Sequence, residues 1–188
     1  MPSTRERFVA TASQLFQEKG YEATSVGEIA AIGELPIGSL YYYFPGGKEE
    51  LGAAAVLFGA QNFAQVLREG LYSEDEPGSA LAACARVLAE RLEASDWHDG
   101  CPVATVALET VHSSDVLQMA AADALSSWVG VISDRLVELG IDRNVAVEIG
   151  VVTVAVLEGA ELMARVSKNR GPLRTTETWL ASFPGLGG

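Results

Sequence analysis

Apolar residues recur with a helical period along most of the chain, and few segments alternate with a period of two. The first such stretch has one apolar stripe, made of Phe8, Ala12, Leu15 and Phe16. Ser3 and Glu6 form a capping box at its start, and Lys19-Gly20 is a helix stop at its end. We therefore predict an all-α fold that begins with an amphipathic helix.

Two short helices across a tight turn are predicted next. Ser25 and Glu28 can cap a second helix whose inward positions are Val26, Ile29 and Ala30. Gly33-Glu34-Leu35 is the predicted turn, and Pro36 suits the first turn of a third helix because its missing N–H is no loss there. Pro45-Gly46-Gly47 ends that helix, and a long helix follows from about Lys48 to Leu71. This order predicts a helix-turn-helix with a supporting helix.

The rest of the chain reads as a helical body. One predicted helix follows Gly78 and ends at about Ala94. The others span Val103–Val111, Asp115–Leu139, Asn144–Lys168 and Leu173–Phe183. The acidic stretch Ser73–Gly78 and the loop Ser95–Pro102 separate them, and the PGLGG tail is expected to be disordered. We predict a DNA-binding head over residues 1–50 and a ligand-binding and dimerisation body over residues 51–188.

The charge of the chain argues against simple electrostatic binding to nucleic acid. It has 188 residues, 48% of them hydrophobic, and a net charge of −12 from 13 basic and 25 acidic residues. Residues 1–50 alone hold four basic and seven acidic residues, a net charge of −3. Phosphates repel such a protein at long range, so DNA binding would need a local patch and helix N-termini.

The segment Pro36–Phe44 has the features of a recognition helix. Leu40 and Phe44 are four residues apart and would pin it to the head, while small residues allow close approach to a groove. The residues expected at the DNA are Thr24, Ser25, Pro36, Ile37, Gly38, Ser39, Tyr41, Tyr42, Tyr43 and Lys48. Hydroxyls of Thr24, Ser25 and the tyrosines, and the Lys48 ammonium, would contact phosphates. The three tyrosines could instead be core residues.

Two runs in this head, TRERFVATASQLFQEKGYEATSVGEIA and GSLYYYFPGGKEEL, resemble the TetR family of bacterial transcriptional regulators. GCPVATVALE and LEGAELMARVSKNRGPLR are similar to the C-terminal domain of the branch with lincomycin-efflux and flavonoid-responsive repressors. The resemblance spans nearly the whole chain and implies a three-helix DNA-binding head on a ligand-binding body that dimerises through its last two helices as a four-helix bundle. It places Thr24, Tyr41, Tyr42 and Lys48 at phosphates, and Ile37, Gly38 and Ser39 at bases.

The head departs from the family pattern at three positions. Glu34 stands where glycine is usual, so Gly33 is expected to supply the flexibility of the turn. Basic residues are frequent where Ile37 and Gly27 stand. Ile37 could contact thymine methyl groups but cannot hydrogen-bond to guanine. We therefore expect weak non-specific binding and few direct hydrogen bonds to bases.

The body is expected to hold a dimer interface and an effector pocket. Val145–Val166 combines small residues with valine and leucine, and burial in a twofold dimer explains so apolar a helix, with Leu173, Trp179, Leu180 and Phe183 completing the interface. Three glutamates interrupt this run, so no membrane span is expected. Candidate lining residues for a small lipophilic effector are Phe58, Asn62, Phe63, Leu88, Trp97, Val106, Glu109, Met119, Trp128 and Met163, although each alone suits a plain core position.

Other classes of protein are poorly supported. No nucleophile elbow, phosphate loop or HExxH motif is present, so we expect neither an enzyme nor a cofactor. His98 with Cys101, and Glu109 with His112, are too loosely spaced for a metal site. Cys84 and Cys101 are expected to be buried thiols in a reducing cytoplasm, and no signal peptide is recognised. A basic run at Arg165, Lys168, Arg170 and Arg174 suits a helix C-terminus better than a second nucleic-acid site.

Together these patterns predict a homodimeric transcriptional repressor that binds a palindromic double-stranded operator and is released by its effector. The alternative is a small-molecule sensor of the same fold whose acidic head has weak or lost operator binding. A metal-dependent helical enzyme is a third and weaker hypothesis.

Overall fold

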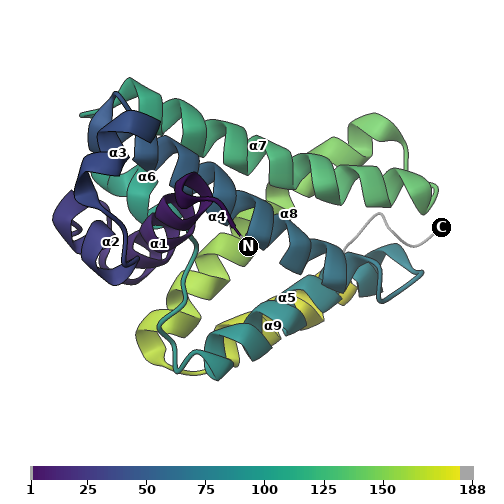
Figure 1. The fold of residues 1–188 in the computed structure, drawn as a ribbon. Helices are drawn as coiled ribbons and strands as arrows, with labels where there is room; N and C mark the ends of the chain where they lie inside the picture. The colour runs from purple at the N-terminus through teal and green to yellow at the C-terminus, as the bar shows by residue number, and fades with distance from the viewer. Residues whose placement is uncertain (1, 183–188) are drawn as a thin grey trace. The chain divides into compact units, whose positions relative to one another are not determined.

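The computed structural model of this protein describes residues 2–182, and those residues contain helices and no strand. The helices are α1 (Thr4–Lys19), α2 (Val26–Ile32), α3 (Ile37–Tyr43), α4 (Gly47–Leu71), α5 (Pro77–Ala94), α6 (Ala104–Thr110), α7 (Asp115–Glu138), α8 (Arg143–Ser167) and α9 (Gly171–Ala181) (Figure 1). Their bounds lie within two residues of the predicted ones. Phe183 and the PGLGG tail lie outside the described residues.

The chain divides into two compact units that do not follow the linear order of the sequence. The first unit combines the described part of Met1–Asn62 with Cys101–Ala124, so α6 and the start of α7 belong with the head. The second combines Phe63–Gly100 with the chain from Leu125 onward. Helices α4 and α7 each run through both units without a break.

The core of the head is built from the apolar stripes seen in the sequence. Phe8, Ile29, Leu40 and Phe44 are fully buried, and the rings of Phe8 and Phe44 meet edge to face with centroids 6.4 Å apart. Leu40 and Phe44 therefore pin α3 and its C-terminal end as predicted. Ser3 and Glu6 form the predicted capping box, and Gly20 takes a positive φ of 89° where α1 ends.

The turn between α2 and α3 differs from the prediction. Gly33 has an ordinary right-handed φ of −72°, whereas Glu34 takes the left-handed φ of 51°. The expectation that Gly33 would supply the flexibility of this turn is therefore wrong. The Arg7 guanidinium donates to the Gly33 carbonyl oxygen over 2.7 Å, and Leu35 is buried, so the surroundings hold Glu34 in a conformation that costs an L-residue roughly 1–2 kcal/mol.

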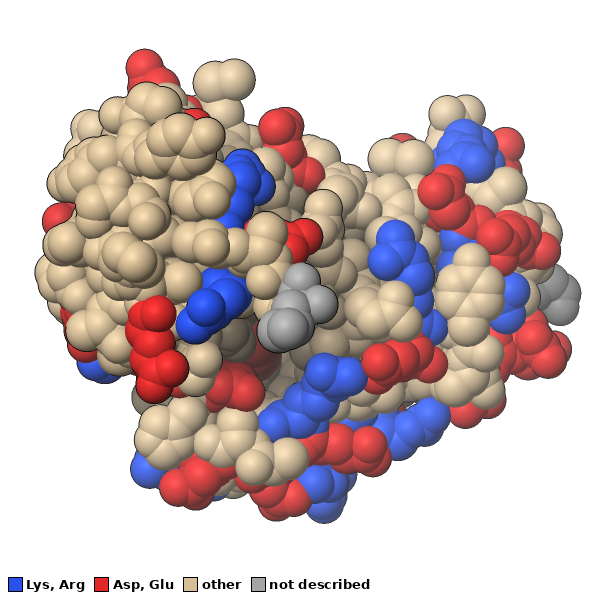
Figure 2. Space-filling model, in the orientation of Figure 1, with Lys and Arg blue, Asp and Glu red and all other residues tan. Residues whose placement is uncertain are grey.

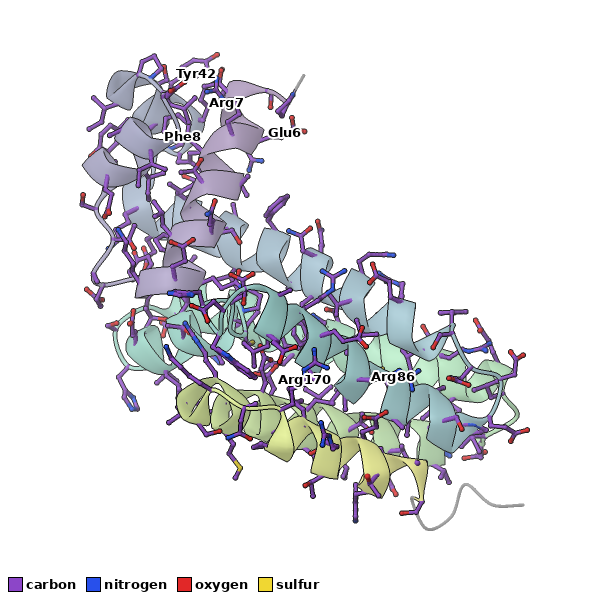
Figure 3. All side chains as sticks on the ribbon, turned by 90° about the horizontal axis from the view of Figure 1, so that it is seen from below. Glu6, Arg7, Phe8, Tyr42, Arg86 and Arg170 are labelled. Atoms are coloured by element: carbon purple, nitrogen blue, oxygen red, sulfur yellow. The ribbon has the colours of Figure 1, made fainter. Side chains whose placement is uncertain are left out.

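In the second unit α9 packs on α5 and α8. Leu173 and Leu180 of α9 are fully buried inside the protomer, so they serve its own core rather than the dimer interface for which the sequence suggested them. Gly70 permits close packing of α4 on α5, because a Cβ there would lie 2.7 Å from the Cys84 backbone nitrogen. Figure 3 shows Arg86 of α5 and Arg170 at the start of α9, which pair with Glu74 and Glu177, and with Glu93.

Candidate nucleic-acid interface

Helix α3 presents a largely uncharged outer face. Ile37 is 53% exposed and Tyr42 is 79% exposed, while Tyr41 is exposed and Tyr43 half-buried against the edge of the Tyr42 ring. A side chain at Gly38 would meet no atom within 4 Å, so the helix surface is open there. The interpretation of Tyr41 and Tyr42 as core residues is wrong, because both side chains are exposed. Figure 3 shows Tyr42 at the surface of the head.

The residues beside α3 that were predicted to contact phosphates differ in how exposed they are. Thr24 is fully buried and its Oγ1 donates to the Gly20 carbonyl oxygen over 2.8 Å, so its hydroxyl closes the connection between α1 and α2. Ser25 is exposed at the N-cap of α2, where its Oγ accepts from the Glu28 N–H. Lys48 is half-buried with Nζ 4.1 Å from the centroid of the Tyr21 ring. Pro36 is the exposed N-cap of α3, and Ser39 is half-buried within it.

Several acidic residues of the head have structural partners. Glu6 accepts from the Ser3 N–H, and Glu50 from the Gly46 N–H. Glu28 pairs with Lys19, and that hydrogen bond lowers the pKa of the Glu28 carboxyl and raises the pKa of Lys19. These carboxylates are used for caps and pairs inside the head. Figure 2 shows the viewed face of the head as mostly uncharged, with few basic side chains.

Helix α6 joins the head through a contact that the sequence did not reveal. Glu109, predicted to line the effector pocket, is exposed, and its Oε2 accepts from the Glu22 backbone N–H over 2.9 Å. The same carboxylate lies against Gly20, where any side chain would collide with it. At the start of α7 the Ser114 hydroxyl donates to the Glu49 carboxylate. Glu109 thus braces the end of α1, which removes it from the candidate pocket residues.

The other candidate effector residues divide between the two units. Phe58, Asn62, Val106 and Met119 belong to the first; Phe63, Leu88, Trp97, Trp128 and Met163 belong to the second. Within the second unit Phe63 and Trp128 are buried with ring centroids 4.4 Å apart, and Leu88 is also buried. Val106 is buried and Phe58 and Trp97 are half-buried, whereas Asn62, Met119 and Met163 are exposed. The exposed positions of these two methionines do not suit an enclosed pocket.

A groove on the first unit was not foreseen from the sequence. It holds about 280 Å³ between α1 and α4, and Phe58 is the candidate residue in its wall. The lining residues are Arg5, Glu6, Val9, Ala54, Leu57, Phe58 and Gln61.

Helix α8 exposes an apolar face. Along one side of the helix lie Val145, Val152, Ala155, Gly159, Leu162 and Val166. The exposed fractions of Leu162 and Val166 are 62% and 78%, which is unusual for aliphatic side chains repeated at helical spacing. Trp179 of α9 is also partly exposed.

No group of three or more potential metal ligands occurs among residues 2–182. Cys84 and Cys101 are buried thiols as predicted, and burial raises the pKa of the Cys84 thiol to about 12. Helix α7 is long and apolar enough to span a membrane by length and composition alone, with a mean hydropathy of 1.3. The same properties describe a core helix, and its Trp128, Ile132 and Leu136 are fully buried.

Known proteins with this arrangement are transcriptional regulators. Residues 8–55 match the family described as "Bacterial regulatory proteins, tetR family", and residues 77–178 match "Transcriptional regulator LmrA/YxaF-like, C-terminal domain". The chain is 32% identical over 170 residues to the HTH-type transcriptional regulator LmrA of Bacillus subtilis, covering 90% of each chain. It is 30% identical to the uncharacterized HTH-type transcriptional regulator YxaF of the same organism, covering 90% of this chain and 89% of the relative.

Solved structures share the fold along nearly the whole chain. The reduced form of E. coli NemR superposes with a TM-score of 0.81 at 25% identity and 94% coverage of each chain. A TetR transcriptional regulator from Legionella pneumophila superposes with a TM-score of 0.79 at 21% identity and 97% coverage of each. The matches to both domains, the sequence relatives and the fold agree: the chain belongs to the TetR family of transcriptional regulators, with an LmrA/YxaF-like C-terminal domain.

Proposed function

We propose that this regulator is a repressor that binds a palindromic operator as a homodimer and leaves it when a small lipophilic effector binds the body. The observation that carries this proposal is the exposed outer face of α3 on a head whose core holds that helix from behind. Ile37 would contact thymine methyl groups, and Tyr41 and Tyr42 would donate hydroxyl hydrogens to phosphates. Backbone N–H groups near Ser25 and the Lys48 ammonium would hold further phosphates.

The exposed face of α8 supports the homodimer. Val152, Leu162 and Val166 would lose contact with water against the same residues of a second copy, since a twofold axis pairs a surface with itself. Ala155 and Gly159 in the middle of this face allow two helices to approach closely. Such a dimer carries two α3 helices, which can read half-sites about one helical turn (~34 Å) or a multiple of it apart.

The continuity of α4 supports the effector response. This helix begins directly after the head and extends through both units, so a change around its second half can reach α3. Glu109 and Ser114 provide a second link, because α6 and the start of α7 bind the head directly. An effector would release DNA only to the extent that it binds the released state more tightly than the operator-bound state.

The test is selection from random double-stranded DNA with the purified protein at low salt, followed by sequencing of the retained molecules. We expect an enriched palindrome whose half-site spacing gives the separation of the two α3 helices. The selected duplex is then titrated at increasing salt, where contacts to phosphates require the affinity to fall. A folded dimer that enriches no sequence would contradict the repressor assignment.

A second candidate is a sensor of the same fold with weak or lost operator binding. The net charge of −3 over residues 1–50 favours it, as does Ile37 at a position where the family often has a basic residue. Under this candidate the selection enriches nothing although effectors still bind the protein.

A further inference from the structure

Two residues of α8 that are fully or almost fully buried, Thr153 and Glu161, each have a side-chain oxygen without a hydrogen-bond partner in the described structure. Glu161 is 5% exposed and its Oε2 has no partner; Thr153 is fully buried and its Oγ1 has none. The two residues lie eight positions apart, about 12 Å along the helix at 1.5 Å per residue. A buried carboxylate oxygen without a donor costs several kcal/mol, so a protein rarely keeps one without a use.

The groups around Glu161 are mostly acidic. Glu158 on the same helix and Asp99 on the loop after α5 raise the pKa of the Glu161 carboxyl, and the Arg165 guanidinium lowers it. Burial has the largest effect, and together these influences raise that pKa to about 8. Arg165 also donates to the His98 carbonyl oxygen over 2.8 Å and packs against Gly100, so its guanidinium is shared with the loop. Two further carboxyl groups and one guanidinium therefore act on the Glu161 carboxyl.

We infer that Glu161 is the polar anchor of the effector site and binds the protonated amine of an otherwise apolar small molecule. An ammonium group supplies three N–H donors and no acceptor, which matches an unpartnered carboxylate oxygen in an acidic setting. Thr153 offers a hydroxyl to a second polar group farther along the ligand. This inference rests on the proposed effector response and names the chemical class of the effector.

Neutral hydrogen-bond donors fit the site less well. A phenol or alcohol would supply one hydrogen bond but no positive charge to a carboxyl group that lies near Glu158 and Asp99. A carboxylate or phosphate ligand would add to the repulsion. The surroundings of Glu161 therefore select for positive charge, and the buried Leu157, about one turn earlier on α8, provides apolar surface beside it.

The experiment compares two fluorescent probes that differ only in this charge. Dansylcadaverine carries a primary amine, and its N-acetyl derivative is neutral and of nearly the same size. Binding of each to the full-length protein is measured by fluorescence without DNA at pH 6 and pH 8. Glu161→Gln removes the charge at the anchor, and the matched control Glu90→Gln removes an exposed carboxylate from α5 in the same unit.

At pH 8 we expect the wild-type protein to bind the amine at least tenfold more tightly than the acetylated probe. Glu161→Gln should lower the amine affinity about tenfold and leave the acetylated probe unchanged, and Glu90→Gln should change neither. The wild-type affinity for the amine should also rise between pH 6 and pH 8, by up to tenfold per pH unit, because the carboxyl must lose its proton to pair.

Equal affinities for the two probes, an unchanged amine affinity in Glu161→Gln, or no binding of either probe would each overturn the inference. Because DNA is absent, this result does not depend on operator binding. A protein that binds the amine through Glu161 but selects no palindrome would keep the anchor and lose the repressor assignment. A protein with the opposite results would keep the repressor and lose the anchor.

Discussion

The head and helix α8 differ in whether their buried polar groups have hydrogen-bond partners. In the head the buried Thr24 hydroxyl donates to the Gly20 carbonyl oxygen, side chains cap the N-termini of α1 and α2, and Leu40 and Phe44 are fully buried. In α8 the buried oxygens of Thr153 and Glu161 lack partners, while Leu162 and Val166 face outward. The buried polar groups of the head have partners within the chain, whereas α8 has buried oxygens without partners and an exposed apolar face.

The largest expected effect is that of the buried Glu161 carboxyl on the pH dependence of stability. The Glu161 carboxyl has a pKa of about 8 in the folded protein and an ordinary value of 4.5 when unfolded. Between these values the folded state holds the extra proton, so stability is fully present below pH 4.5 and falls as the pH rises, by up to about 1.4 kcal/mol per unit. Glu161→Gln removes this loss. Urea unfolding should find it more stable than the wild type at pH 8, by several kcal/mol at most.

At pH 5 the advantage of Glu161→Gln should shrink, because that pH lies close to the ordinary pKa of 4.5 and keeping the folded carboxyl protonated then costs little. Glu90→Gln, at an exposed position on α5, should show no such trend. A difference in unfolding free energy between wild type and Glu161→Gln that stays the same at both pH values would mean that the Glu161 carboxyl titrates normally.

The exposed apolar face gives the next largest effect. Leu162→Glu would bury two charges at the proposed twofold interface, where each uncompensated charge costs several kcal/mol. We expect the dimer to dissociate at micromolar concentration in sedimentation velocity, with a loss of about 100-fold or more in operator affinity, or about 2.7 kcal/mol. Leu108 on α6 is 81% exposed and makes a matched control, since Leu108→Glu adds the same charge elsewhere. A Leu162→Glu variant that remains dimeric would place the interface on another surface.

How far the sequence predicts each region follows from how local its interactions are. Leu40 and Phe44 could be assigned to the core because they lie four residues apart on one helix, and the capping box spans only Ser3 to Glu6. Glu109 could not be placed, because its partner, the Glu22 N–H, is 87 positions away and a backbone donor leaves no mark in the sequence. Its place in an apolar run made it resemble a pocket residue.

The sequence alone did not identify Glu161 as a buried acid. Glu161 served only as a break in an apolar run that argued against a membrane span, since nothing local distinguishes a buried glutamate from an exposed one. Its helical phase relative to Thr153 and Leu157 places it on the buried side, but that side was known only once the exposed residues were identified. Thr24 was predicted to contact a phosphate, but its buried hydroxyl donates to the nearby Gly20 carbonyl oxygen instead.

A moderate effect is expected from the uncharged α3 face. Ile37→Lys adds a cation to an exposed position on that helix and should raise affinity for DNA about tenfold at low salt, measured by fluorescence anisotropy. The salt dependence of binding should steepen by about one additional counterion. Leu108→Lys changes the net charge equally without altering α3, so it should leave affinity nearly unchanged. If the wild-type protein barely binds DNA and Ile37→Lys raises the affinity for DNA strongly, the result would favour the sensor as the function.

The smallest effect tests the one strained position within the otherwise satisfied head. Glu34 holds a φ of 51°, and Glu34→Gly would relieve a cost of roughly 1–2 kcal/mol while adding about 0.5–1 kcal/mol of backbone entropy to the unfolded chain. The net gain in unfolding free energy should be up to about 1 kcal/mol in urea titrations. Glu34→Ala removes the charge but keeps a Cβ in the left-handed conformation, so it should not be stabilised. Equal stabilisation by both variants would mean that repulsion among the acidic residues, rather than the backbone, limits the stability of the head.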